Sequence, residues 1–288
     1  MISNIDFSII IPHYNIPEML ERLLKSIPQK DNIEVIVVDD KSDKDLEKLL
    51  LLKSTNPNVT FCDNTLQKGA GNSRNVGLRQ AKGKWILFAD ADDYFTEDFY
   101  EIVSEHINDK ADIVFFSPTS VDIDSGLTSG RHIEFCKILK RYVDNPTKKN
   151  ELSLRYELVA PWSKLIRHDF LVKHNIQFEN TLVANDVMFC RKLGLYAEHI
   201  EVYEENIYVI VSREGSLTSG FDEKRFDIRL DTFLRSGIFI KNHIDSEMWK
   251  LLHMNGSYFL HIARINHLGA KKMVEIISKF IHYGIYIF

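Results

Sequence analysis

The sequence lacks most of the features that mark several common protein classes. Its three cysteines, Cys62, Cys136 and Cys190, are odd in number and lack metal-ligand spacing, which favours a reducing compartment over a disulfide framework. No apolar run approaches the roughly 20 residues that span a bilayer, and residues 1–6 lack the cationic and apolar parts of a signal peptide. The formal net charge is −5, so no overall basic field indicates nucleic acid as a partner. We therefore expect a soluble cytoplasmic protein.

Two familiar nucleotide-binding loops are also absent. Gly69-Ala-Gly71 precedes a predicted helix, but no Gly-Lys-Ser/Thr follows it, and the pattern G-x-G-x-x-G does not occur. Both glycines permit positive φ and a close approach of the backbone to a ligand. The histidines show no spacing typical of zinc, and we expect solvated or core roles for most of them.

Apolar strand-like runs alternate with helical patterns over the first 117 residues. Strands are predicted at 7–12, 34–39, 59–62, 85–89 and 111–116, and helices at 18–27, 45–52, 72–81 and 95–107. Such alternation is typical of βαβ units and of a mainly parallel sheet covered on both faces. The first half of the chain is therefore predicted to be an α/β domain.

The pattern changes after about residue 117. Residues 118–155 are polar and irregular, and we interpret them as a variable insertion. Farther on, strands are predicted at 160–166, 200–203 and 207–211, and helices at 169–174 and 186–197. From Asp222 the pattern is helical to the end, with an interruption near Gly269. With 288 residues, of which 44% are hydrophobic, the chain can form one large domain or a main domain with an appendage.

Acidic residues end two of the predicted strands. Asp39 and Asp40 follow one strand, and Asp90 and Asp92 follow another. Ligands of open α/β sheets bind beyond the carboxyl ends of the strands, so we expect both pairs to converge on one crevice. Neighbouring carboxylates repel one another by roughly 1 kcal/mol per pair even in water, so a hard cation such as Mg²⁺ or Mn²⁺ with a bound diphosphate fits them. The alternative is a solvated turn in which Asp92 or the acid after it caps the helix predicted from residue 95.

Several runs, in this order, resemble the family 2 glycosyltransferases, which have the GT-A fold. The matching runs are Ser8-Ile-Ile-Ile-Pro-His-Tyr-Asn15, Glu34-Val-Ile-Val-Val-Asp-Asp-Lys-Ser-Asp43, Gly69-Ala-Gly-Asn-Ser-Arg-Asn-Val-Gly77, Trp85 to Tyr94, Pro161-Trp-Ser-Lys-Leu-Ile-Arg167 and Asn185-Asp-Val-Met-Phe189. The resemblance covers roughly residues 6–218.

This resemblance implies an α/β fold of the GT-A (Rossmann-like) class, with a central, mainly parallel sheet flanked by helices. The GT-A domain would occupy residues 1–218, with a nucleotide-binding half at 1–117 and an acceptor-side half at 118–218. Residues 219–288 would form a helical C-terminal extension. The resemblance also implies a nucleotide-diphospho-sugar donor, a Mn²⁺ or Mg²⁺ ion, and sugar transfer with inversion at the anomeric carbon.

On the donor side, the resemblance assigns roles by position. Asp92 matches the last acid of the family's Asp-x-Asp and would ligate the metal, and Asp90 matches the first and would accept hydrogen bonds from the ribose. Asp40 matches the position that recognises the base, where a carboxylate accepting from uracil N3–H would select uracil over cytosine. Pro12 and Tyr14 lie on the first predicted loop and would flank the base, although Tyr14 also fits an ordinary half-buried aromatic.

Two basic residues complete the expected donor site. Arg74 would brace the acidic cluster or reach the nucleotide phosphates, and its alternative is a structural ion pair. The run 212–218 resembles the family's late loop that closes over the diphosphate, with Arg213 and Ser216 as the expected contacts. Apolar Ile210 stands where the family often carries a further basic residue.

On the acceptor side, Asp186 matches the second acid of the family's Glu-Asp pair and is the candidate general base. Asn185 replaces the first acid, and a neutral neighbour favours an ionised Asp186. Trp162 and Lys164 are expected to line the acceptor side, with the tryptophan ring stacked on a sugar. The alternatives are a helix N-cap for Asp186 and a core position for Trp162.

These assignments predict an inverting glycosyltransferase that moves a sugar from a UDP-sugar to a glycan or lipid-linked glycan acceptor. The expected pathway is bacterial cell-surface polysaccharide, such as lipopolysaccharide or capsule, because soluble bacterial relatives commonly act there. The alternatives are a non-catalytic nucleotide-sugar-binding or scaffold domain and a sugar nucleotidylyltransferase. The latter carries a Gly-rich, Arg/Lys-bearing signature where this chain has Ile11-Pro-His-Tyr-Asn15.

The C-terminal stretch 271–288 mixes lysines with Ile, Phe and Tyr at partly helical spacing. Such a segment could rest on an anionic membrane surface, which would place the protein peripherally at the inner face of the cell membrane. The alternative is a helix that packs on the core or on a second subunit.

Overall fold

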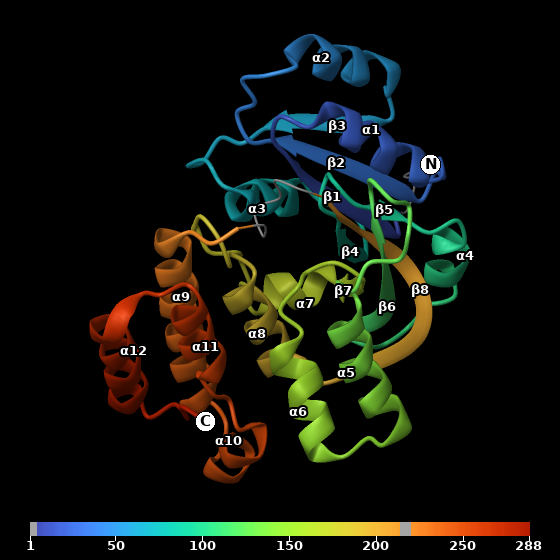
Figure 1. The fold of residues 1–288 in the computed structure, drawn as a ribbon. Helices are drawn as coiled ribbons and strands as arrows, with labels where there is room; N and C mark the ends of the chain where they lie inside the picture. Colours follow the sequence, from blue (N-terminus) through green and yellow to red (C-terminus); the bar gives the residue numbers. More distant parts are fainter. Residues whose placement is uncertain (1–4, 214–219) are drawn as a thin grey trace.

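The computed structural model describes residues 5–213 and 220–288, and its strands form one mixed eight-stranded sheet (Figure 1). The strands are β1 (Phe7–His13), β2 (Ile33–Asp39), β3 (Val59–Asp63), β4 (Trp85–Phe88), β5 (Tyr94–Phe95), β6 (Ile113–Asp122), β7 (Lys164–Arg167) and β8 (Ile200–Ser212). Their order in the sheet is β3-β2-β1-β4-β7-β6-β8-β5. The first four neighbours run parallel, as predicted, while β7 is antiparallel to both β4 and β6, and β5 is antiparallel to β8.

Helices cover both faces of the sheet because its central strands are apolar on both sides. The helices up to the end of the sheet region are α1 (Pro17–Ser26), α2 (Leu46–Thr55), α3 (Ala70–Gln80), α4 (Phe99–Ser104), α5 (Ile133–Asp144), α6 (Lys148–Glu157), α7 (His168–Lys173) and α8 (Val187–Tyr196). Side chains alternate along β1, so Ile9 packs in one cluster with Leu20 of α1, whereas Ile10 packs on the opposite face with Phe189 of α8. The continuous apolar run at 9–11 is therefore fully buried, which is typical of parallel sheets.

The interpretation of residues 118–155 as an irregular insertion is wrong. Strand β6 continues to Asp122, and helices α5 and α6 follow it. On α5, Phe135, Ile138 and Leu139 are buried at the i, i+3, i+4 spacing of an amphipathic helix. Helix α6 begins at a capping residue, since the Thr147 side chain accepts a hydrogen bond from Asn150 N.

Two further boundaries differ from the prediction. The strands predicted at 200–203 and 207–211 are one strand, β8, whose pairing with β6 shifts register opposite residues 116–118. The exposed polar residues 204–206 lie in this irregularity and break the apolar pattern. The helix predicted from residue 95 begins only after Asp98, because residues 94–95 pair with β8 as strand β5. Neither Asp92 nor the acid after it caps that helix, so the capping alternative for this turn is wrong.

The glycine turn before α3 permits a close contact between chain segments. Gly69 has a φ of 146°, which strains any residue with a side chain. A Cβ at Gly71 would overlap the carbonyl oxygen of Glu179 and touch Asn185. The glycines therefore bring α3 against the segment that precedes α8.

The C-terminal region is helical, as predicted. It consists of α9 (Glu223–Lys241), α10 (Ser246–Leu252), α11 (Ser257–Ile265) and α12 (Gly269–Tyr283), which lie to one side of α8 in Figure 1. Their buried side chains, such as Leu230 and Phe280, form a third apolar cluster together with Leu152 and Tyr156 of α6. Within the described ranges, no helix combines the length and hydropathy needed to cross a bilayer.

Candidate active site

The acidic loop after β4 turns one carboxylate inward and leaves two at the surface. Asp93 is 3% exposed and accepts hydrogen bonds from the Tyr208 hydroxyl at 2.9 Å and from Val211 N at 2.8 Å. The same hydroxyl oxygen accepts from Asp90 N at 2.8 Å. Burial, followed by the charges of Asp90 and Asp92, raises the pKa of Asp93 well above its usual value. Asp90 and Asp92 are therefore the carboxylates of this loop that a ligand can reach.

Arg74 joins three separate segments at this site. Its guanidinium donates to Asp90 Oδ1 at 2.5 Å and to Asn185 Oδ1 at 2.9 Å. The Arg74 side chain is 6% exposed and lies over the Phe178 ring, 5.2 Å from its centroid. Because the cation is shielded from water, these charge-assisted bonds hold α3, the β4 end and the segment before α8 in fixed relation.

Asp92 lies against Arg213. The Arg213 Nη2 to Asp92 Oδ2 distance is 3.3 Å, and both side chains are 26% exposed. Burial raises the pKa of Asp92, the Asp90 charge adds to this effect, and Arg213 opposes it. The other predicted contact of the late loop, Ser216, lies outside the described residues.

Asp186 stands directly before α8 and belongs to the same group of charges. It occupies the N-cap position of α8, as the alternative assignment predicted, but its side chain makes no capping hydrogen bond. Burial raises the pKa of its carboxyl group, the Arg74 guanidinium opposes this shift, and the Asp90 charge adds to it. Asp186 is also one of the residues that line a cavity of about 640 Å³, which extends to the C-terminal helices.

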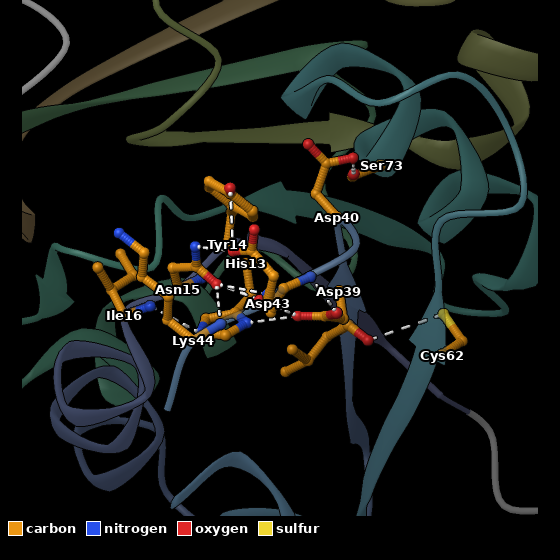
Figure 2. A network of polar contacts seen from close by, with 12 residues as sticks. His13, Tyr14, Asn15, Ile16, Asp39, Asp40, Asp43, Lys44, Cys62 and Ser73 are labelled. Atoms are coloured by element: carbon orange, nitrogen blue, oxygen red, sulfur yellow. Dashed lines mark hydrogen bonds and ion pairs between the residues drawn. The ribbon is translucent and has the colours of Figure 1, made fainter. Parts of the chain in front are cut away.

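Asp39 is held by a hydrogen-bonded cluster at the ends of β1 and β2, drawn in Figure 2. It accepts from His13 Nδ1 at 2.8 Å, and from Ser42 N at 2.9 Å and Ser42 Oγ at 2.6 Å. Because Ile16 N donates to His13 Nε2, the ring proton lies on Nδ1. Burial opposes ionisation of Asp39, but these hydrogen bonds outweigh it and lower its pKa to about 2. Asp39 thus stabilises the loop that follows β1.

Asp40 points away from that cluster, toward Ser73 (Figure 2). Its Oδ1 accepts from Asn64 Nδ2 at 2.6 Å and from Ser73 Oγ at 3.2 Å, and both oxygens accept from Gly69 N at 2.9 Å. Oδ2 therefore has the greater spare capacity to accept another hydrogen bond. Asp40 is only 6% exposed. Because it is buried among these hydrogen-bond donors, they fix the orientation of its carboxylate.

Two residues expected to flank the base occupy different surroundings. Pro12 lies within β1, not on the following loop, which corrects the sequence interpretation. Tyr14 is 40% exposed, and the Lys68 ammonium group lies 3.6 Å from its ring centroid. One face of the Tyr14 ring is thus covered by a cation, and its hydroxyl donates to Asp43 at 3.3 Å.

The prediction that Lys164 lines the acceptor side is wrong. The residue is 2% exposed, and its ammonium group donates to the carbonyl oxygens of Leu158 at 2.9 Å and Ala160 at 2.6 Å. Burial lowers its pKa. Trp162 is half-buried, and its ring stacks on the Tyr208 ring with a centroid separation of 5.7 Å. Much of the Trp162 ring therefore packs against the core, as the alternative assignment predicted.

The carboxylates at this site fit a metal cation that takes only some of its ligands from the protein. Over the described ranges, no group of three or more His, Cys, Asp or Glu side chains is arranged to hold a metal. Asp92 and Asp90, in contrast, offer partly exposed carboxylates beside each other. Mg²⁺ and Mn²⁺ accept one or two carboxylates when substrate phosphates and water supply the remaining oxygens. The residues present fit such an ion.

Two further residues support the acidic loop although no sequence pattern predicted them, Tyr208 and Arg22. Tyr208 links the two ends of the acidic loop, and Arg22 of α1 donates to the carbonyl oxygen of Asp92 at 2.5 Å. Tyr208 lies within the continuous buried apolar run 207–211 of β8, and Arg22 lies on the polar face of its helix. Nothing local in the sequence distinguishes either residue, because their partners are distant along the chain.

Comparison with known proteins gives consistent results. The model of the family described as Glycosyl transferase family 2 matches residues 8–173. An uncharacterized glycosyltransferase of Haemophilus influenzae is 35% identical over 94% of this chain and 90% of its own length. The poly(ribitol-phosphate) beta-N-acetylglucosaminyltransferase TarS of Staphylococcus aureus is 27% identical over 73% of this chain. The match spans only 36% of the TarS sequence.

Solved structures show the same fold. S. aureus TarS 1–349 in complex with UDP-GlcNAc superposes with a TM-score of 0.72 and 21% identity, covering 97% of this chain and 80% of that one. The mannosyltransferase PcManGT from Pyrobaculum calidifontis, in complex with GDP-Man and Mn²⁺, superposes with a TM-score of 0.62 and 17% identity over 96% of this chain and 79% of that one. These likenesses place the central sheet and its helices in the GT-A class.

Proposed function

The chain belongs to glycosyl transferase family 2 and is a glycosyltransferase; from this premise we propose that it transfers a sugar with inversion from a UDP-sugar to a glycan acceptor. The observation that carries this proposal is the position of Arg74 between Asp90 and Asn185, with Asp186 beside them. Donor-side and acceptor-side residues thereby share one set of charges. A sugar bound there would have its leaving group near Asp90 and its opposite face toward Asp186.

The donor is proposed to be a uridine diphosphate sugar. Asp40 Oδ2 would accept from uracil N3–H, a proton that cytosine lacks. The fixed orientation of this carboxylate supports a role in selectivity, because the donors around it prevent it from turning toward another base. The similar TarS structure contains UDP-GlcNAc, which supports N-acetylglucosamine or a related hexose as the transferred sugar.

A divalent cation is proposed to bind at Asp92, with the donor diphosphate and water as its other ligands. The bound cation would supply stabilisation of the negative charge that develops on the departing diphosphate. Arg213, which pairs with Asp92 in the structure, is proposed to contact the phosphates of the bound donor. The Mn²⁺-bound structure of the P. calidifontis mannosyltransferase supports this part of the proposal.

Asp186 is proposed to act as the general base. It would take the proton from the acceptor hydroxyl as the oxygen attacks the anomeric carbon and the bond from that carbon to the diphosphate breaks. Attack from the face opposite the leaving group inverts the configuration. Burial raises the pKa of Asp186, which makes its carboxylate a stronger base, and the Arg74 guanidinium opposes part of this shift.

The acceptor is proposed to be a glycan or lipid-linked glycan of a bacterial surface polysaccharide. TarS is named as a poly(ribitol-phosphate) beta-N-acetylglucosaminyltransferase, which supports a polymeric acceptor. Peripheral contact with the inner face of the membrane remains part of this proposal, since Val274 and Ile281 of α12 are 65% and 67% exposed on one side of that helix.

Donor hydrolysis tests the function directly. Purified protein is incubated with UDP-, GDP- and CMP-sugars in the presence of Mn²⁺, and release of the nucleotide is measured. We expect UDP-sugars to be hydrolysed fastest, and Asp186→Asn to lower turnover by roughly a hundredfold or more while UDP affinity is retained. Asp245→Asn is the matched control, because Asp245 is a helix N-cap far along the chain whose side chain accepts from Met248 N. Equal turnover by Asp186→Asn and wild type would remove Asp186 as the base.

A further inference from the structure

The cavity beside Asp186 is bounded by two parts of the chain that are distant in sequence. Tyr156 and Asp186 line it from the sheet region, and Arg229 and Phe233 line it from α9. Tyr258, at the start of α11, closes another side. The cavity measures about 640 Å³, which lies within the range of roughly 300–1,000 Å³ typical of small-molecule sites. The C-terminal helices therefore complete a pocket that begins at the candidate base.

The walls combine aromatic surface with two arginines, Arg191 and Arg229, that form no ion pair with the residues that the structure describes. Arg229 is half-buried, and no hydrogen bond or ion pair joins it to any residue within 5–213 or 220–288. Arg191 is 5% exposed and donates to Ser236 Oγ and to Phe233 O, but its Nε has no partner in the same described ranges. A guanidinium withdrawn from water is costly unless an anion pairs with it.

The acidic groups in the same walls do not meet this need. Glu157 accepts from Ser153 Oγ at 2.9 Å, and its charge acts on Arg191 from a distance, but within the described part of the chain it forms no ion pair with either arginine. Asp186 feels Arg74 more strongly than any other positive charge. A ligand with its own negative charge would therefore satisfy the cationic side of the cavity.

We propose that this cavity binds the acceptor, that the acceptor is a saccharide bearing an anionic group, and that Arg229 pairs with that group. The inference rests on the proposed function and specifies its acceptor. The aromatic side chains of Phe233 and Tyr258 offer apolar surface to the face of a sugar ring, and Asp186 lies where an acceptor hydroxyl must be deprotonated. The anionic group is a phosphate or a carboxylate, because either can form a bidentate pair with a guanidinium.

The test uses three sugars that differ only in charge and its source. Glucose, glucose 6-phosphate and glucuronate are titrated by calorimetry into the full-length protein with saturating UDP and Mn²⁺. We expect the anionic sugar of the correct type to bind at least tenfold more tightly than glucose. Arg229→Gln should remove that preference, while Arg229→Lys should retain part of it. Hydrogen exchange at residues 252–259 should slow when the preferred sugar binds.

The control variant is Lys224→Gln, which removes the same charge from an exposed position of α9 outside this cavity. It should keep both the preference and the stability of the wild type. Equal affinities for the three sugars, or an undiminished preference in Arg229→Gln, would overturn the proposal. If Arg229→Gln does not fold, the wild type alone decides. Equal affinities of the wild type for the three sugars, or unchanged hydrogen exchange at residues 252–259, would then overturn the proposal.

Donor hydrolysis by the wild type distinguishes a failure of this inference from a failure of the proposed function on which it rests. A protein that hydrolyses UDP-sugars but binds the three sugars equally retains the proposed function and loses the anionic acceptor. If the wild type hydrolyses no UDP-sugar, the proposed function is contradicted, whatever affinities are measured for the three acceptor sugars.

Discussion

Replacing Arg74 should change the pH dependence of catalysis as well as stability. The residue holds Asp90 and Asn185 through bonds of 2.5 and 2.9 Å from a guanidinium that is 6% exposed. In Arg74→Met both acceptors lose their partner. Breaking a buried ion pair costs about 3–5 kcal/mol, and the one-third exposure of Asp90 reduces this to about 3 kcal/mol. That loss corresponds to a Tm lower by roughly 6 °C for a protein of this size.

The catalytic consequence follows from the charge on Asp186. Burial raises the pKa of that carboxyl group, and the Arg74 guanidinium is the largest effect that lowers it. Removing Arg74 therefore raises the pKa of Asp186 further. Because the base must be ionised, the acidic limb of kcat/KM against pH should move to higher pH. Arg74→Lys keeps the positive charge, so it should shift the acidic limb of the pH profile less than Arg74→Met does. It should do so even though lysine cannot reproduce both guanidinium hydrogen bonds, to Asp90 and Asn185.

The assay measures donor hydrolysis between about pH 5 and pH 9, together with thermal melting of each variant. Arg167→Met is the control, because Arg167 is a half-buried arginine that donates to the carbonyl oxygens of Asp109 and Ala111, away from the acids. It should lose stability without moving the limb. An acidic limb that stays fixed in Arg74→Met, or moves to lower pH, would refute the coupling between Arg74 and Asp186.

Two other predictions concern how the site is built. Gly71→Ala should destabilise the protein by about 2 kcal/mol in urea unfolding, because the new methyl group overlaps the Glu179 carbonyl oxygen. Gly130→Ala is the control and should be close to neutral, because its methyl group meets only the flexible end of Ile133 at 3.6 Å. Equal destabilisation by the two variants would contradict the close packing of α3. The ionised form of Asp39, whose pKa is lowered from 3.8 to about 2, should contribute about 2 kcal/mol of stability above pH 4 that is lost as the pH falls toward 2. The difference in unfolding free energy between wild type and Asp39→Asn should thus be smaller at pH 3 than at pH 7, and a constant difference would argue against the lowered pKa.

The first half of the fold could be predicted because its elements carry strong local signals. Strands β1, β2 and β4 each contain a run of at least three consecutive apolar residues, and each was predicted within one or two residues of its bounds. Helix α5 also has a clear signal at residues 135, 138 and 139, but the glycines and prolines around it suggested a loop. In β8 the exposed acids at 204–205 interrupt the apolar pattern without ending the strand.

The candidate site could be predicted only where residues end strands or begin helices. Asp40, Asp90 and Asp186 occupy such positions, and the parallel sheet brings strand ends to one edge. Lys164 could not be placed, because a lysine is rarely fully buried and its carbonyl partners come from a turn whose shape the sequence does not reveal. Arg229 was missed because its significance depends on a cavity formed by helices far apart in the chain.

The central claim is that a cation held by Asp92 binds the donor diphosphate. Calorimetric titration of UDP, with Mn²⁺ and separately with EDTA, measures that claim most directly in wild type and in Asp92→Asn. We expect Mn²⁺ to strengthen UDP binding by the wild type at least tenfold, or about 1.4 kcal/mol, and Asp92→Asn to lose most of this gain. Equal UDP affinity in Mn²⁺ and in EDTA for the wild type would contradict it.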